Sequence, residues 1–238
     1  MNYALVGYGR MGRMIEEILL QSGESISGRV DLTELSGLSE IQGPIDVIID
    51  FSHPDNLLNT LAFSKSTGIP AVIGTTNLTS EHKKAIKDAA QSAPILYSAN
   101  YSLGVAVIKK AARMLFDALG EDFDVEIIET HHNKKADAPS GTAKAIADAI
   151  DPENEIERIY GRNGAPGARK REIGIHAVRG GTVAGEHKVM FFGEDETLEI
   201  RHEAISRRIF AKGAVKAAKW LSGKPAGLYS MEDVLWGE

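Results

Sequence analysis

Residues 131–137, H-H-N-K-K-A-D, carry two imidazoles, two ammonium groups and a carboxylate, and S-G-T follows at residues 140–142. An imidazole exchanges protons near neutral pH. Because an Ala-rich helical pattern begins at residue 142, we expect the backbone N–H groups of Ser140, Gly141 and Thr142 to lie at the first turn of a helix, where they would be unpaired within the helix and would suit a carboxylate or phosphate. The segment predicts an anionic substrate bound at a helix start, with proton transfer beside it.

A structural explanation competes with this functional one. Polar loops before helices often hold a Ser or Thr cap, a proline and a few solvated lysines. Each residue of the segment taken singly fits that explanation, and it is their clustering that favours a site.

The elements around this segment are a strand before it, over residues 123–128, and a helix after it, over residues 142–150. Further strand patterns follow with only that one short helix among them, at residues 172–179, 186–192 and 196–203. Such a run predicts an α+β domain with a mainly antiparallel, open sheet. An open sheet needs a cover, so we expect an oligomer built through it.

A second motif stands at the N-terminus, where a strand pattern leads into G-Y-G-R-M-G at residues 7–12 and then into a helix. In this arrangement Gly7 allows the tight turn, Gly9 lets a pyrophosphate approach the backbone, and Gly12 allows close packing of helix on strand. Arg10 and Met11 complete the loop and are included in the predicted cofactor contacts. The alternative is a turn that is merely rich in glycine.

Asp31 follows the second predicted strand, about 20 residues beyond the glycine loop, where a carboxylate accepts hydrogen bonds from the adenosine ribose. It would repel a 2′-phosphate, and the next residue, Leu32, is not basic. We therefore expect NADH to be used at least as well as NADPH. Arg10 and Arg29 are alternative phosphate partners and count against that preference.

Strand and helix patterns continue to alternate as far as residue 97, which predicts a parallel, doubly wound sheet. Residues 32–44 are too few for a full helix and its loops. Ligands bind beyond the carboxyl ends of such strands. The predicted contacts there are Phe51, Gly74, Thr75, Thr76, Ser98, Ala99, Asn100 and Tyr101. Position alone leaves the 74–76 segment open to being a simple turn with a helix cap nearby.

The helical pattern returns at residues 207–221 and is followed by an apolar tail. We therefore expect a Rossmann-like dinucleotide-binding domain of residues 1–102 and 206–238. A substrate-binding and oligomerisation domain, residues 103–205, is inserted in it. Two crossings between the domains would permit hinge closure over bound ligand.

Residues 158–171 are basic and rich in glycine. A solvated, mobile loop is the favoured interpretation, and a cation for the anionic site is the other. Arg179, before two glycines, would either reach ligand or pair with Glu186.

Composition limits the class of protein. The chain has 238 residues, 43% of them hydrophobic, a net charge of −6 and no cysteine. The negative charge argues against nucleic-acid binding, and no apolar run approaches the roughly 20 residues of a membrane span. The absence of cysteine excludes disulfides and thiolate metal sites. We expect a cytoplasmic enzyme without a metal.

Taken together, the motifs G-Y-G-R-M-G, D-F-S, G-T-T, S-A-N-Y-S, H-H-N-K-K-A-D-A-P-S-G-T and R-G-G with G-E-H resemble, in this order, those of the 4-hydroxy-tetrahydrodipicolinate reductase family. This family, also called dihydrodipicolinate reductase, serves the diaminopimelate route to lysine. The resemblance covers nearly the full chain, and its H-H-x-x-K-x-D-A-P-S-G-T run is highly specific.

The resemblance implies NADH or NADPH as cofactor, a homotetramer assembled by the inserted sheet domain, and reduction of a cyclic dicarboxylic imine. Hydride from the nicotinamide would build negative charge through the imine, and an acid would quench it. By position His131 resembles the proton donor, with Lys135 a second candidate. His132, Lys135 and the 140–142 turn resemble the substrate contacts. Leu32 departs from members that use NADPH well, which often have a basic residue there.

Two other functions remain open from the residues. One is another NAD(P)-dependent amino-acid dehydrogenase, for example one acting on aspartate, which has no need of a loop that holds two carboxylates. The other is a non-catalytic redox sensor that binds NADH and a partner protein.

Overall fold

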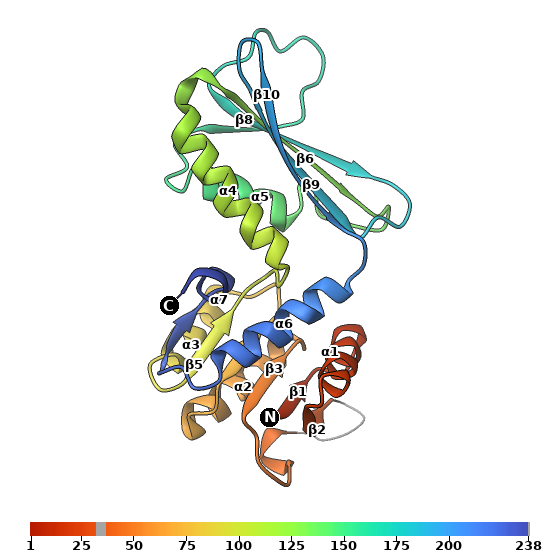
Figure 1. Ribbon diagram of the computed structural model, residues 1–238, viewed down its shortest axis with the longest axis vertical. Helices are drawn as coiled ribbons and strands as arrows, with labels where there is room; N and C mark the ends of the chain where they lie inside the picture. The colour runs from red at the N-terminus through yellow and green to blue at the C-terminus, as the bar shows by residue number, and fades with distance from the viewer. Residues whose placement is uncertain (32–36, 238) are drawn as a thin grey trace. The chain divides into compact units, whose positions relative to one another are not determined.

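The computed structural model describes residues 1–31 and 37–237 (Figure 1). The chain divides into two compact units, Met1–Leu103 with Arg208–Glu238, and Gly104–Arg207. They are called unit 1 and unit 2 below. No helix in the described part of the chain is long and apolar enough to cross a membrane.

Unit 1 is built on a six-stranded sheet in the order β11-β5-β4-β3-β1-β2, with every pair of neighbours parallel. This confirms the predicted parallel, doubly wound sheet. The strands are β1 (Asn2–Val6), β2 (Ser25–Val30), β3 (Val47–Asp50), β4 (Ala71–Ile73), β5 (Pro94–Tyr97) and β11 (Gly227–Tyr229). The helices are α1 (Arg10–Gln21), α2 (Pro54–Thr67), α3 (Ser80–Ala89), α6 (Arg208–Leu221) and α7 (Met231–Trp236), with a 3-10 turn, η1, at Leu38–Glu40.

Helices cover both faces of this sheet, which is why its central strands are almost continuously apolar. Helices α2 and α3 pack together over one face, and α1 packs with α6, which runs along β3, β4 and β5 (Figure 1). β3 shows the result, since Val47, Ile48 and Ile49 are all buried. The sheet is therefore a rigid platform for the loops at its carboxyl ends.

The last strand, β11, is absent from the sequence prediction, which placed only an apolar tail there. It has three residues, G-L-Y, and pairs in parallel with β5. A strand this short has too little alternation to be recognised locally, because it is defined by its partner.

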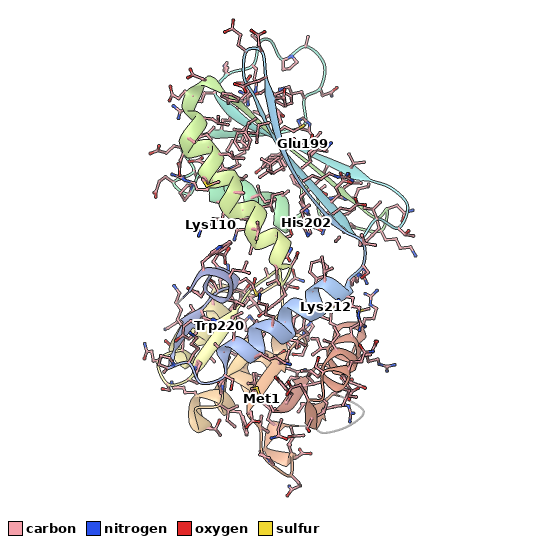
Figure 2. All side chains as sticks on the ribbon, viewed as in Figure 1. Met1, Lys110, Glu199, His202, Lys212 and Trp220 are labelled. Carbon is pink, nitrogen blue, oxygen red and sulfur yellow. The ribbon has the colours of Figure 1, made fainter. Side chains whose placement is uncertain are left out.

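Gly213 provides a stability test of this packing. A Cβ at Gly213 would overlap the carbonyl oxygen of Tyr101. Ala normally stabilises a helix interior by about 1 kcal/mol over Gly, but overpacking costs about 1–3 kcal/mol. We expect Gly213→Ala to lower the free energy of unfolding, measured by urea titration of tryptophan fluorescence. Lys212→Ala, at the exposed neighbour labelled in Figure 2, is the control and should change it little. A stabilised Gly213→Ala variant would show that the contact is not close.

Unit 2 contains a five-stranded sheet in the order β10-β9-β6-β8-β7. The two pairings at the β10 end are antiparallel and the two at the β7 end are parallel, so the sheet is mixed. Its strands are β6 (Asp124–His131), β7 (Glu157–Tyr160), β8 (Glu172–Arg179), β9 (Gly185–Phe192) and β10 (Thr197–Ala204), and its helices are α4 (Leu103–Leu119) and α5 (Gly141–Ile150), with a 3-10 turn, η2, at Gly120–Asp122. The expected α/β fold with a second, open sheet is confirmed, and β7 is the strand that sequence analysis missed.

Both helices of unit 2 pack on one face of its sheet. Val125 and Ile127 of β6 point into that core, which also contains Ile108 of α4 and Ile146 of α5. The intervening residues point to the other face, where Val178 and Phe192 are exposed. Since side chains alternate along a strand, Glu129 belongs to the helix-covered face.

The basic segment at residues 158–171 is held by ion pairs. Arg162 contacts Glu126 at 2.9 Å and also pairs with Glu172. Arg169 contacts Asp124 at 2.6 Å and Glu126 at 3.3 Å. Residues 161–168 are exposed, as expected for a solvated segment, while Arg162 and Arg169 are held by these ion pairs.

Candidate active site

The residues of the predicted catalytic segment meet at one end of the unit 2 sheet. β6 and β8 are parallel, so their carboxyl ends, His131 and Arg179, are paired neighbours. β9 runs the opposite way and begins at that same end, which places His187 beside Glu129. Helix α5 starts just after the β6 end and brings Ser140 to it. The strand register thus assembles residues that are far apart in sequence.

Glu129 lies at the centre of this cluster with no exposed surface. It accepts hydrogen bonds from His131 Nδ1 at 2.6 Å, from both terminal nitrogens of Arg179 at 2.7 and 2.8 Å, and from the Ser140 N–H at 2.9 Å. Burial alone would raise the pKa of Glu129, but the bonds from His131, Arg179 and Ser140 lower it to about 2. Glu129 is therefore ionised throughout the physiological pH range.

The ionised carboxylate determines the tautomer of His131. A carboxylate only accepts hydrogen bonds, so Nδ1 of His131 carries a proton and Nε2 is the nitrogen left for exchange. A Cβ on Gly185 would lie 3.0 Å from Nε2, so a larger residue would crowd that nitrogen. His131 is thus oriented for general acid chemistry at Nε2.

His187 packs against His131 edge to face, with ring centroids 5.2 Å apart. Its Nε2 lies 3.2 Å from the Ser140 hydroxyl. Burial, and secondly the charge of His131, lower the pKa of His187 to about 4. His187 is therefore neutral at physiological pH and puts no second positive charge beside His131.

The start of α5 is a helix N-terminus of the predicted kind. Ser140 is the N-cap, and its hydroxyl accepts from the Ala143 N–H at 3.1 Å. Ser140 is also buried, and its own N–H is taken by Glu129. Gly141 is exposed and Thr142 half-buried in the first turn of α5, where the helix dipole favours an anion.

Lys135 is already paired in this structure. Its Nζ lies 2.7 Å from the Asp137 carboxylate. The hydrogen bond from Lys135 and, more weakly, the backbone N–H groups of Asp137 and Gly141 lower the pKa of Asp137. The Asp137 carboxylate thus contacts both Lys135 and the start of α5, which were predicted to bind a substrate anion. Next to them, His132 Nδ1 is buried and has no hydrogen-bond partner among the described residues, so a ligand could satisfy it.

Sequence analysis left open whether Arg179 reaches a ligand or pairs with Glu186, and the pairing with Glu186 is wrong. The partner of Arg179 is Glu129, and Glu186 pairs instead with Arg201. Glu129 and His187 were not predicted as site residues. The available signal was that each is a polar residue at an inward position of an otherwise apolar, alternating strand.

In unit 1 the glycine loop has the features that a dinucleotide requires. Gly7 has φ +86°, which favours glycine, and a Cβ there would lie 2.6 Å from the Phe51 oxygen. A Cβ on Gly12 would overlap the Gly7 oxygen. Gly9 faces open space and begins α1, which has no side-chain cap and no acidic residue in its first turn. Uncapped N–H groups and an open approach fit a pyrophosphate.

Arg10 is exposed and Met11 half-buried at the start of α1. Asp31 is half-buried at the end of β2, while Leu32 lies outside the described residues. Arg29 donates to Glu16 at 2.8 Å and lies over the Tyr8 ring. Arg29 is therefore engaged inside the protein, whereas Arg10 faces solvent.

The loops after β3 and β4 are tied together by Asp50. This buried carboxylate accepts from the Ser52 N–H and hydroxyl, from Thr60 at 2.6 Å and from Thr75 at 2.8 Å. The Thr75 side chain is thus committed to Asp50, and Thr76 next to it is exposed.

Phe51 lies between the predicted cofactor loops. A Cβ on Gly74 would overlap its ring, and the Tyr101 ring is 5.2 Å away. Tyr101 is buried and donates to the Ile73 oxygen at 2.8 Å. The structure therefore brings Gly7, Phe51, Gly74 and Tyr101 together.

The loop after β5 is held by its own hydrogen bonds. The Ser98 hydroxyl donates to the Asn100 carbonyl at 2.7 Å, and the Asn100 side chain accepts from the Ser102 N–H. Ala99 between them is exposed. This bonding fixes the shape of the loop and leaves Ala99 at its surface.

A parallel sheet with an open glycine loop, together with an oriented imidazole at an anion-binding turn, defines the class as NAD(P)H-dependent oxidoreductases. Comparison with known proteins identifies the family within this class. Residues 1–101 match the family described as dihydrodipicolinate reductase, N-terminus, and residues 104–235 match its C-terminus. The chain belongs to this family, and the predicted enzyme class, cofactors and role in lysine biosynthesis are confirmed.

Individual relatives support the same family assignment. A 4-hydroxy-tetrahydrodipicolinate reductase of Exiguobacterium sp. is 42% identical over 98% of this chain and 95% of its own. One from Pseudomonas fluorescens is 48% identical over 90% of this chain and 82% of its own. Among solved structures, a dipicolinate-bound dihydrodipicolinate reductase from Paenisporosarcina sp. has a TM-score of 0.77 at 24% identity, over 98% of both chains.

Proposed function

We propose that the protein reduces the cyclic dicarboxylic imine of its family with His131 as the proton donor. Lys135, His132 and the N–H groups of Gly141 and Thr142 bind the substrate carboxylates. NAD(P)H, held at the glycine loop, supplies the hydride. Doubly protonated His131 then donates the proton on Nε2 to the charge that develops on the imine, and it keeps the Nδ1 proton that bonds to Glu129.

The observation that carries this proposal is the Glu129–His131 hydrogen bond beside the start of α5. It supports His131 over Lys135 as the acid, because the ring is held in one orientation while Lys135 is occupied with Asp137. A helix N-terminus, a cation and an unsatisfied imidazole nitrogen next to that ring suit a carboxylate ligand.

The direct test is NADH oxidation followed at 340 nm. The reaction is started with the product of the preceding synthase, generated in place. We expect rapid oxidation that depends on this product, and inhibition by dipicolinate. A protein that binds NADH but leaves it unoxidised would overturn the proposal, as would one that oxidises NADH only with aspartate-type substrates.

Asp137 gives a prediction about substrate binding. Substrate carboxylate competes with Asp137 for Lys135 if both use the same ammonium group. Asp137→Asn keeps the size of the side chain and removes its charge, so we expect a lower KM and a smaller change in kcat. Steady-state kinetics check this. Asp148→Asn, an exposed acid on α5, is the control. An unchanged or higher KM in Asp137→Asn alone would mean that the two carboxylates do not compete.

Cofactor preference is a separate prediction. We propose that Asp31 binds the adenosine ribose, so that NADH is used at least as well as NADPH. Ratios of kcat/KM for the two cofactors check it, and a tenfold or greater advantage for NADPH would remove Asp31 from this role. Its half-buried position at the end of β2 supports the assignment.

We also propose a homotetramer assembled through the uncovered face of the unit 2 sheet, where Val178 and Phe192 are exposed. Light scattering in solution gives the mass directly, and a monomer would contradict the assignment. We further propose that the protein is cytoplasmic, as expected from the sequence.

Hinge closure over bound ligand, at the two chain connections between the units, is also part of the proposed function.

A further inference from the structure

Glu129 connects three parts of the site through one side chain. It contacts the ring of His131 at the end of β6, the guanidinium of Arg179 at the end of β8, and the backbone of Ser140 at the start of α5. Its carboxylate has no exposed surface. Removing Glu129 therefore affects the acid and the anion-binding turn together.

The contacts use all the acceptor capacity of the carboxylate. Oε2 accepts from His131 Nδ1 and from one Arg179 nitrogen, and Oε1 accepts from the Ser140 N–H and the other Arg179 nitrogen. A carboxylate offers about four lone-pair positions, so none is left over. The neutral amide of a glutamine at this position would have one oxygen and one NH₂ group. In either orientation the NH₂ group would face two hydrogen-bond donors and could accept from neither. Only a carboxylate satisfies this arrangement.

We infer that Glu129 is a positioning residue for the reduction: it keeps the proton of His131 on Nδ1, presents Nε2 to the substrate, and fixes the start of α5 beside that nitrogen. This inference rests on the proposed role of His131. The other neighbours of the ring do not provide the same restraint. His187 contacts it edge to face, and Gly185 lies beside Nε2 without a side chain.

Position matters in this chemistry because a small misplacement of a catalytic group lowers the rate by about 10²-fold. The productive arrangement has Nδ1–H bonded to Glu129 and a second proton on Nε2 facing the substrate, and an imidazole that is free to rotate without this carboxylate spends little time in it. Loss of Glu129 should therefore act on kcat, while NADH binding at the glycine loop is preserved.

The test compares Glu129→Gln with Glu126→Gln. Glu126 is a matched control, because it lies on the same strand, pairs with Arg162, Arg169 and His176, and points to the opposite face. We expect Glu129→Gln to lower kcat by about 10²-fold or more, with the Kd of NADH unchanged. Glu126→Gln should stay within about threefold of the unmodified protein. The two variants are compared only if light scattering gives them the same mass as the unmodified protein, so that a change in assembly does not account for a change in kcat.

The second readout is the ¹⁵N chemical shifts of the His131 ring, which distinguish Nδ1–H from Nε2–H. We expect Nδ1–H in the unmodified protein and in Glu126→Gln, and a mixture in Glu129→Gln. If Glu129→Gln does not fold, Glu129→Asp is used instead. It keeps the charge but withdraws the oxygens by one methylene, and kcat should still fall at least about tenfold.

Two results would overturn the inference. One is a Glu129 variant with near-normal kcat and an unchanged tautomer. The other is equal loss in the Glu129 and Glu126 variants, which would indicate general destabilisation. Should the unmodified protein itself fail to reduce the imine, the proposed function is wrong, and the ring shifts still decide whether Glu129 positions His131.

Discussion

Replacing His131 by alanine is expected to lower kcat by roughly 10²–10⁴-fold, which is the size of a general acid contribution. Only the ring and its bond to Glu129 are removed, since Glu129 keeps its bonds to Arg179 and Ser140. Lys135→Ala should cause a loss of similar size if its ammonium group orients the substrate or supplies the proton. It should also raise KM, because a carboxylate loses its cation.

Single-turnover and steady-state NADH oxidation check these values. Lys134→Ala is the matched control for Lys135→Ala, because Lys134 is an exposed lysine in the same turn. It should retain nearly full activity. Fluorescence titration with NADH should give an unchanged Kd in all three variants, since the predicted cofactor contacts lie in unit 1. If both His131→Ala and Lys135→Ala kept nearly full kcat, the assigned chemistry would be wrong.

Much of the fold could be predicted because its signals are local. The strand, glycine loop and helix at residues 2–21 follow one another directly, and the spacing of apolar residues shows each element. β8 is predicted to the residue for the same reason. β7 and β11 escape because they are short and depend on their partners β8 and β5.

Prediction of the site was limited in the same way, because residues that are distant in sequence could not be placed together. His131, Lys135 and Ser140 lie within ten positions of one another, so their clustering is visible in the sequence. Glu129 and Arg179 are 50 positions apart and meet only because β6 and β8 pair in one particular register. The sequence offered Glu186, seven positions from Arg179, as one of two open alternatives for Arg179, the other being a ligand. Long-range register cannot be read from residue types alone.

The buried pair of Glu129 and Arg179 predicts the largest effect on stability. Replacing Arg179 by methionine leaves the Glu129 carboxylate in a buried place with fewer donors. Breaking a buried pair by removing one partner costs about 3–5 kcal/mol, and we expect about 3 kcal/mol because Arg179 is partly exposed. Arg201→Met is the control, since the Arg201 side chain is exposed in its ion pairs with Glu186 and Glu203, and exposed ion pairs contribute little.

The effect should depend on pH in a defined direction. Glu129 has a folded pKa of about 2 against an ordinary value of 4.5, so its stabilising contribution is complete above pH 4.5 and is lost as pH falls toward 2. In Arg179→Met the folded pKa rises back toward 4.5, so the difference between the two proteins shrinks over that interval. His187, with a folded pKa of about 4, loses its contribution between pH 6.5 and 4 in both proteins, so it largely cancels.

Urea unfolding at pH 7, 5 and 3.5 measures this difference. Both tryptophans, Trp220 (labelled in Figure 2) and Trp236, lie in unit 1. Their fluorescence therefore follows unit 1, whereas far-UV circular dichroism follows both units. We expect Arg179→Met to destabilise the circular dichroism transition and to leave the fluorescence transition nearly in place. A stability difference that stayed constant from pH 7 to 3.5 would show that the lost interaction is packing and not the charge of Glu129, because only an ionised carboxylate needs the guanidinium.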